Sequence, residues 1–197
     1  MRALTVGIVD YGVGNHASVW RALHALGYRC RVSSEPEVLS DTDLLLLPGV
    51  GAFPPAMAEA FLPHPAMAAS FTAELTEAEM DAYVAAFFKP GDADLPAIFK
   101  ADIRRTDGQA RSGLGSSIRP DGYRDVVEAA ARLTVPLAIL HGEQEQLVNA
   151  AYFRALTMPT LWRGAVQVIP GAGHAPHWEQ PERFNALLQT FIQECVR

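Results

Sequence analysis

Apolar residues in the first fifty positions alternate between short continuous runs and helical spacing. Leu4–Val9 is one such run, Tyr28–Val32 is expected to be a second strand, and Asp43–Leu47 is a third, continuous in leucine after Asp43. Between the first two segments, apolar residues recur three and four positions apart across Val19–Leu26, and Gly27 supplies a stop. Strand, helix and strand in alternation, with runs apolar on both faces, predict a parallel sheet.

The pattern of apolar and polar residues changes after residue 53. Prolines break the next seventy residues into short helical patterns, and no strand pattern occurs among them. One pattern starts with a capping box, in which Thr76 and Glu79 are spaced to satisfy each other's backbone N–H groups. An insertion of this length between strands is too long for a loop and predicts a helical cap over residues 58–120.

Strand and helix alternation resumes beyond the cap. We expect two strands, Leu137–Leu140 and Ala165–Ile169, and three helices at Tyr123–Leu133, Asn149–Leu156 and Pro181–Cys195. The last helix has proline at its favoured first position and one apolar stripe along its length.

These elements predict an α/β fold with a five-stranded, mostly parallel sheet in the order 2-1-3-4-5. Helices would cover both faces, and the cap would be inserted after strand three. We expect residues 1–197 to form a single domain: strands one to three in 1–57, the cap in 58–120, and strands four and five in 121–197.

Charge and composition limit the classes of binding partner that we expect. The 197 residues include 16 Lys and Arg against 22 Asp and Glu, giving a net charge of −6 with no basic block. We therefore expect neither nucleic acid nor a membrane as partner, and a small-molecule ester at most. No apolar run approaches a membrane span or a signal peptide, which favours a cytoplasmic protein. The two cysteines, Cys30 and Cys195, are expected to be reduced, buried thiols.

Neither a metal nor another cofactor is expected. His64, His141 and His177 have no carboxylate or cysteine at metal-ligand spacing. An edge strand of the truncated sheet is open to pairing, so a homodimer is conceivable.

An acid and a histidine follow the last two predicted strands. Strand four ends in HGEQEQLV, which contains Glu145, and strand five ends in PGAGHAP, which contains His174. Because the carboxyl ends of adjacent parallel strands share one edge of the sheet, the two side chains can meet there. A carboxylate beside an imidazole fixes the tautomer of the ring and stabilises its protonated form, as in a hydrolase triad.

From about Pro55 to Arg197 the chain resembles the C-terminal part of an esterase-type α/β-hydrolase. The motifs are HGEQEQLVN for the acid turn and GAGHAPHWEQPERF for the histidine loop and last helix. The resemblance implies that His174 is the catalytic histidine and Glu145 the acid, a position usually held by Asp. The cap falls where this family places its lid.

A nucleophile is missing from this pattern. The family carries its serine in a Gly-x-Ser-x-Gly turn between a strand and a helix, and the sequence contains none. The serines in a glycine-rich setting, in RSGLGSSIRP, follow the cap without a preceding strand. We expect Ser112, Ser116 and Ser117 to lie in a surface turn.

The first 57 residues resemble a different family, the glutaminase subunit of imidazole glycerol phosphate synthase, a class I glutamine amidotransferase. The motifs are IVDYGVGN, SVWRALHALGY and LLLLPGVGAFPPAM. The resemblance implies that the turn with Asn15 lies near a synthase partner and that Pro48–Gly51 corresponds to an oxyanion strand. The catalytic cysteine of that family has no counterpart here, because Cys30 lies in a predicted strand and Cys195 in the last helix.

The two resemblances meet at the first turn. Laid against a hydrolase nucleophile elbow, the segment DYGVGNH places Gly12 at the nucleophile position, which leaves that position empty. The candidate oxyanion donors are the backbone N–H groups of Val13, Gly49, Val50 and Gly51. We therefore predict a recombined chimera, natural or engineered, with an acid–histidine pair but no efficient catalysis.

Two alternatives remain open. One is a weak carboxylesterase in which Glu145 and His174 activate water or the hydroxyl of Tyr11. The other is an amidotransferase-like module that binds a synthase barrel through the loops at Asn15 and Gly49–Gly51.

Overall fold

In a computed structural model the chain forms two compact units. The first comprises Met1–Val50 with Asn185–Arg197, and the second comprises Gly51–Phe184. The structure describes residues 4–10, 16–46, 57–92, 94–117 and 126–195.

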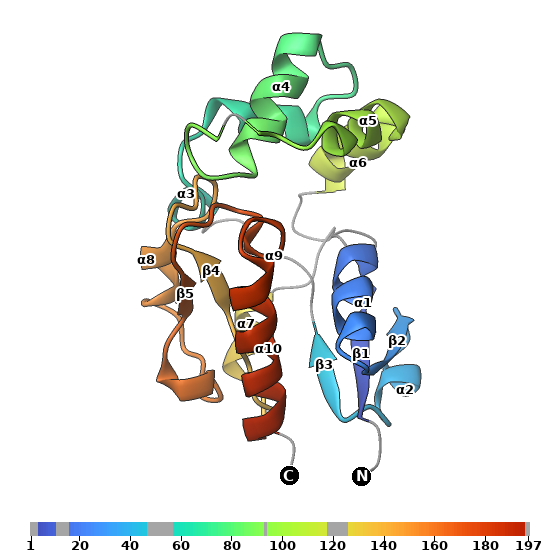
Figure 1. The fold of residues 1–197 in the computed structure, drawn as a ribbon, viewed down its shortest axis with the longest axis vertical. Helices are drawn as coiled ribbons and strands as arrows, with labels where there is room; N and C mark the ends of the chain where they lie inside the picture. Colours follow the sequence, from blue (N-terminus) through green and yellow to red (C-terminus); the bar gives the residue numbers. More distant parts are fainter. Residues whose placement is uncertain (1–3, 11–15, 47–56, 93, 118–125, 196–197) are drawn as a thin grey trace. The chain divides into compact units, whose positions relative to one another are not determined.

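The first unit contains a parallel three-stranded sheet, as the apolar runs predict. Its strands are β1 (Thr5–Val9), β2 (Arg29–Ser33) and β3 (Leu44–Leu46), in the order β2-β1-β3 (Figure 1). Val6 of the central strand pairs with Cys30 on one side and Leu44 on the other. The 2-1-3 part of the predicted strand order is therefore confirmed.

Two helices pack on this sheet, α1 (His16–Ala25) and α2 (Pro36–Leu39). Leu23 of α1 and Ile8 of β1 are both fully buried. Gly27 ends the α1 segment at φ +83°, a conformation that costs a glycine little because it has no Cβ. The predicted helix and its glycine stop are both confirmed.

The second unit begins with five helices and no strand among the described residues between 57 and 117. They are α3 (Met57–Ala60), the 3-10 helix η1 (Pro65–Phe71), α4 (Glu77–Ala86), α5 (Ala97–Arg105) and α6 (Gly108–Ser117). The capping box at the start of α4 is present as predicted, with Thr76 and Glu79 exchanging hydrogen bonds. Local capping chemistry thus sets where this helix starts.

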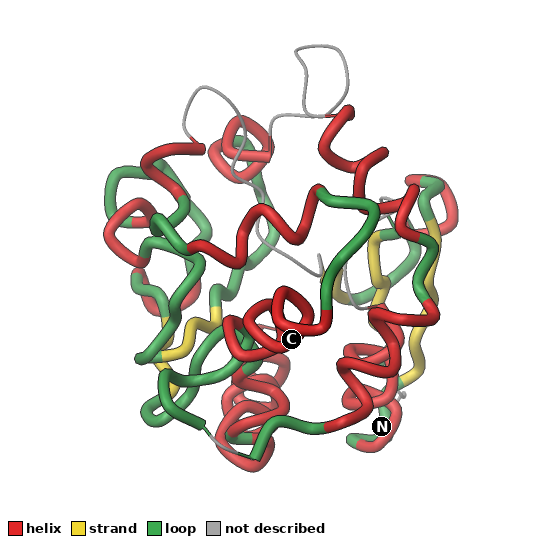
Figure 2. Tube along the Cα trace, turned by 90° about the horizontal axis from the view of Figure 1, so that it is seen from above, coloured by secondary structure: helices red, strands yellow, loops and turns green. Residues whose placement is uncertain are grey.

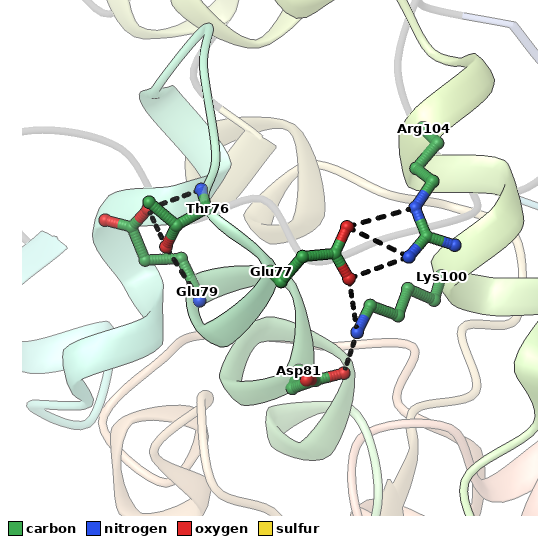
Figure 3. A network of polar contacts seen from close by, with 6 residues as sticks. All are labelled: Thr76, Glu77, Glu79, Asp81, Lys100 and Arg104. Carbon is green, nitrogen blue, oxygen red and sulfur yellow. Dashed lines mark hydrogen bonds and ion pairs between the residues drawn. The ribbon is translucent and has the colours of Figure 1, made fainter.

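Ion pairs join α4 to α5 (Figure 3). Glu77 accepts hydrogen bonds from two nitrogens of Arg104, with an Nη2–Oε2 distance of 2.7 Å. It also forms an ion pair with Lys100 at 2.9 Å. Lys100 bridges onward to Asp81. The hydrogen bonds from Lys100 and Arg104 lower the pKa of Glu77, so the carboxylate stays charged at neutral pH.

The prediction of a surface turn at Ser112–Ser117 was wrong, because these residues belong to α6. The hydroxyl of Ser112 donates to the carbonyl of Gln109, and that of Ser116 to the carbonyl of Ser112. Arg111 anchors the helix by donating to the carbonyls of Thr72 and Ala73 at 2.9 and 2.6 Å. These long-range bonds outweigh the poor helix propensity of glycine and serine.

The rest of the second unit carries the other two strands. β4 (Leu140–Gly142) and β5 (Gln167–Ile169) pair in parallel, which confirms the 4-5 part of the strand order. β4 lies further along the chain than predicted, since Leu137 forms only an isolated bridge with Leu161. In the described residues the five strands form two sheets, β2-β1-β3 and β4-β5.

The second unit also contains α7 (Val126–Ala131), α8 (Ala150–Phe153), the 3-10 helix η2 (Trp162–Gly164) and α9 (Pro176–Glu179). The helix α10 (Pro181–Cys195) starts at the end of the second unit and continues into the segment Asn185–Arg197 of the first. The bounds of α10 match the predicted helix, whereas α9 was not foreseen. Figure 2 shows how much of the chain is helix and loop and how short the strands are.

A hydrophobic cluster joins η1 and α4 to the region that follows β4 in the second unit. Ala66 of η1 and Ala86 of α4 lie in the same buried cluster as Leu147, Val148 and Phe153. Burial of this shared apolar surface stabilises the second unit.

Two further predictions concern the cysteines and membrane-spanning segments. Cys30 and Cys195 are free, as predicted, but both are half-buried rather than buried, and burial raises the pKa of both thiols. Among the described helices none has the length and apolarity needed to cross a membrane.

Candidate active site

The acid turn follows β4 and is built around a close backbone approach. A Cβ on Gly142 would overlap the carbonyl oxygens of Ala172 and Gly173, so only glycine fits there. The turn is then joined to the β5 end by backbone bonds from Glu143 to Ile169 (3.0 Å) and from Gln144 to Ala172 (2.8 Å). Two strand ends that are far apart in sequence are thereby held at a fixed separation.

Glu145 and His174 meet across this junction, as the sequence predicts. Oε2 of Glu145 lies 2.8 Å from Nδ1 of His174, and Oε1 accepts the N–H of Leu147 at 2.7 Å. The Glu145 side chain is 6% exposed and that of His174 is 28% exposed. The acid is thus buried behind the imidazole, which faces outward.

The electrostatics favour a charged Glu145. Burial by itself raises the pKa of this carboxyl, but the hydrogen bond and charge of His174, together with the N–H groups of Leu147 and Val148, outweigh it. The net effect is a lowered pKa, so Glu145 is a carboxylate at neutral pH. A carboxylate can only accept, and Nδ1 of a neutral His174 must therefore carry the proton.

The other ring nitrogen of His174, Nε2, does not bind Glu145. Nε2 has no hydrogen-bond partner among the described residues. In the Nδ1–H tautomer it bears the lone pair, as required of a group that takes a proton from a nucleophile. Burial and the charge of His174 lower the pKa of His177, so this second imidazole is neutral at pH 7.

An aromatic side chain at the end of α4 packs against the imidazole of His174. The ring of Phe87 meets that of His174 edge to face, with centroids 5.1 Å apart, and Tyr83 meets Phe87 in the same way at 5.0 Å. Tyr83 in turn accepts a hydrogen bond from Ser70 at 3.3 Å. His174 is therefore in contact with the aromatic ring of Phe87 as well as with Glu145.

His64 and His141 have local roles. Nδ1 of His64 accepts the N–H of Ala66 and caps η1, while Nδ1 of His141 lies 2.7 Å from the carbonyl of Gly142. Nε2 of His141 is buried and has no hydrogen-bond partner among the residues that the structure describes. Within the described ranges no three His, Cys, Asp or Glu side chains converge as a metal site would require.

The other predicted site residues lie outside the described residues. They are the nucleophile position Gly12, the alternative nucleophile Tyr11, the oxyanion candidates Val13, Gly49, Val50 and Gly51, and Asn15 of the proposed synthase-binding turn. The sequence therefore remains the basis for these assignments.

Two residues of the site escaped the sequence prediction. Gln146 donates from Nε2 to the carbonyls of Phe88 (2.7 Å) and Ala85 (3.3 Å), and Glu179 binds the histidine loop through its backbone. Gln146 follows the acid directly and Glu179 lies within GHAPHWEQPERF, so both were within quoted motifs. Gln146 binds backbone carbonyls that lie 58 and 61 residues away in the sequence, and Glu179 binds a backbone N–H that lies 90 residues away. No local sequence pattern reveals such partners.

Gly173→Ala is expected to lower the free energy of unfolding by about 2 kcal/mol. A Cβ at this position would overlap the backbone of Phe88 and Lys89, so the histidine loop would have to move away from these two residues. Urea unfolding followed by tryptophan fluorescence measures the change.

Gly113→Ala is the matched control. Gly113 lies inside α6 with nothing within 4 Å of its added Cβ, so we expect a gain of about 0.5–1 kcal/mol. Equal effects of the two substitutions would show that residue 173 is not a close approach.

Comparison with solved structures identifies hydrolase folds. An N-acyl homoserine lactonase, AidH, superposes with a TM-score of 0.73 at 22% identity, covering 92% of this chain and 69% of the lactonase. An esterase from Exiguobacterium antarcticum gives 0.64 at 12% identity, covering 97% and 92%. Carboxylesterase CesB from Bacillus subtilis gives 0.59 at 16% identity, covering 96% and 84%. At these identities the likeness establishes the fold alone.

Comparison with curated sequences gives a second family. Imidazole glycerol phosphate synthase subunit HisH of Exiguobacterium sibiricum is 55% identical over 53 residues, 27% of each protein. The subunit of Symbiobacterium thermophilum is 56% identical over 46 residues, 23% of this chain and 22% of the subunit. The matches span about a quarter of the length of these relatives.

Both predicted resemblances are therefore confirmed, and the chain combines an amidotransferase-like segment with an α/β-hydrolase part. The hydrolase match covers more of the chain than the sequence motifs indicated. The model of the "Alpha/beta hydrolase family" matches residues 12–187, whereas the motifs began near residue 55. That range is most of the 197 residues. The chain belongs to the alpha/beta hydrolase family.

Proposed function

We propose that this chain is an ester-hydrolase-type protein that retains the acid–base pair but lacks the nucleophile, and so does not hydrolyse esters efficiently. The observation that carries the proposal is the 2.8 Å contact between Oε2 of Glu145 and Nδ1 of His174. With Glu145 holding the tautomer, Nε2 of His174 is the general base.

The consequence of an empty nucleophile position is severe. Removal of the nucleophile from a serine hydrolase lowers kcat by roughly a million-fold, because no acyl intermediate can form. We assign that position to Gly12, which is where the family match begins. The oxyanion donors would be the N–H groups of Val13 and Gly49–Gly51.

The architecture we propose for this site is one five-stranded sheet in the order 2-1-3-4-5, forming a single domain with residues 58–120 as cap. Two findings support it: the separate orders β2-β1-β3 and β4-β5, and the hydrolase folds of the structural neighbours. The partner would be a small-molecule ester at most, in a cytoplasmic protein that pairs with a second copy only through an open sheet edge.

Hydrolysis of a p-nitrophenyl ester tests the proposed function. We expect the purified protein and its His174→Ala variant to give equal rates within about twofold, because a base without a nucleophile cannot form an acyl intermediate. The release of p-nitrophenol is followed by absorbance at pH 7. A rate more than about tenfold above that of the variant would instead establish the weak esterase, in which Glu145 and His174 activate water or Tyr11.

A second candidate function rests on the HisH-like segment. Its 55% identity over 53 residues favours an amidotransferase-like module that binds a synthase barrel through the loops at Asn15 and Gly49–Gly51. Titration with such a barrel, showing no complex at micromolar concentration, would remove this candidate.

A further inference from the structure

Glu179 binds two backbone segments that are far apart in sequence. Its Oε2 accepts the N–H of Gly173 at 2.7 Å, and its Oε1 accepts the N–H of Lys89 at 2.6 Å. Gly173 directly precedes His174, and Lys89 is the third residue after the end of α4. One side chain on α9 therefore joins the histidine loop to the exit of a cap helix.

The two segments are also in direct contact. Ala175 donates its N–H to the carbonyl of Phe87 at 2.9 Å, and Gly173 lies so close to Phe88 and Lys89 that no Cβ fits between them. We call residues 87–89 and 173–175, with Glu179, the clasp. All of its residues belong to the second unit, and the side chains of Phe87 and His174 pack on each other at its edge.

A carboxylate suits this position for a chemical reason. Both backbone groups are donors, so the side chain between them must offer two acceptors, and hydrogen bonds from N–H to a charged oxygen are shorter and stronger than neutral ones. An amide would offer one acceptor and turn an NH₂ group toward the second N–H. The part-buried setting of both bonds makes an unpaired donor costly.

We propose that Glu179 is a positioning residue: by closing the clasp it holds the His174 ring in the Nδ1–H tautomer facing Glu145. The bond to Gly173 fixes the backbone next to His174, and the bond to Lys89 fixes the segment that carries Phe87 against the ring. The cap and the base are thus coupled through one carboxylate. This inference rests on the proposed role of His174 as general base.

The test is NMR of Glu179→Gln in the full chain. Nitrogen-15 shifts of the His174 ring, assigned with His174→Ala, report the tautomer, and hydrogen exchange reports the amides of Gly173 and Lys89. We expect the variant to lose the single Nδ1–H tautomer and to exchange at least one of the two amides about tenfold faster. Both readouts are obtained without substrate, so they stand whether or not the ester assay supports the proposed function.

Glu182→Gln is the control, because it is the same substitution three positions further along the chain. Glu182 is exposed and lies in the first turn of α10. It is expected to leave tautomer and exchange unchanged. A Glu179→Gln variant that loses thermal stability but keeps the tautomer would overturn the positioning role and leave a purely structural tie.

Glu179→Asp covers the case in which Glu179→Gln does not fold. Aspartate keeps two charged acceptors but is one methylene shorter, so it cannot reach both N–H groups at their present spacing. We expect faster exchange at one amide and a mixed tautomer of His174; parental values for both would contradict the proposal.

Discussion

Gly12→Ser is expected to raise ester hydrolysis at least about a hundredfold above the parent chain. If Gly12 occupies the nucleophile position, the introduced hydroxyl lies within hydrogen-bond reach of Nε2 of His174. His174 then takes the hydroxyl proton as the introduced oxygen attacks the ester carbonyl. His174 returns this proton to the leaving alcohol or phenol, and the acyl group remains on the introduced oxygen. Gly12 lies outside the described residues, so this expectation rests on the sequence and on the start of the family match.

The gain should fall short of the million-fold that a complete site owes to its nucleophile. The proposed oxyanion donors belong to a segment similar to that of another family, and an oxyanion hole stabilises the intermediate only when it is preorganised. We therefore expect acylation to exceed deacylation and one acyl group per chain to accumulate, measured by intact mass after reaction with a p-nitrophenyl ester.

Gly12→Ser combined with His174→Ala is the control. It keeps the hydroxyl and removes the base, so both the acyl adduct and the added rate should disappear. A Gly12→Ser protein that folds but forms no adduct would show that Gly12 is not the nucleophile position, while the pairing of Glu145 with His174 would stand.

The meeting of Glu145 and His174 could be predicted because it follows from topology. Parallel strands place their carboxyl ends at one edge, and an acid turn followed by a histidine loop occupies two neighbouring ends. The N-terminus of α4 and both bounds of α10 could be predicted for a different reason. A capping box and a leading proline are local signals that act over a few residues.

The helix α6 could not be predicted because its stability is not local. Its sequence is rich in glycine and serine, which disfavour helix in isolation. Its support comes from Arg111, which reaches residues 72 and 73, and from the packing of Gly115 near Phe71. No periodicity in residues 108–117 encodes those partners.

The clasp was missed for a similar reason. Glu179 belongs to a motif that was quoted for the histidine, but its second partner lies 90 residues earlier in the chain. A backbone N–H has no sequence signature, so a carboxylate that binds only backbone looks in sequence like any solvated glutamate. The displacement of β4 from its predicted position also reflects pairing, since its partner β5 decides which residues form the ladder.

Glu145→Gln is expected to lower the free energy of unfolding by about 2 kcal/mol at pH 7. The substitution leaves His174 without its charged partner while keeping an acceptor for the N–H of Leu147. Loss of one member of a fully buried pair costs roughly 3–5 kcal/mol, and the partial exposure of His174 reduces that figure by solvent screening.

The pH dependence of this loss identifies its origin. The pKa of Glu145 is lowered in the folded protein, so its stabilisation is present above the carboxyl pKa of the unfolded chain, about 4.3, and disappears as the pH falls through the folded value. The parent chain and Glu145→Gln should therefore differ most above about pH 5, and the difference should shrink progressively as the pH falls below about 4.3. Urea unfolding at several pH values, followed by tryptophan fluorescence, measures the difference.

Glu143→Gln is the matched control on the same turn. Glu143 is exposed and accepts only the N–H of Gly171, at 3.1 Å, so its replacement should cost no more than about 0.5 kcal/mol. A Glu145→Gln deficit that stays the same from pH 7 down to the lowest pH at which both proteins fold would mean that the contact does not depend on a charged carboxylate. Nε2 of His174 would then not be held as the base, and the assignment of an intact acid–base pair would fail with it.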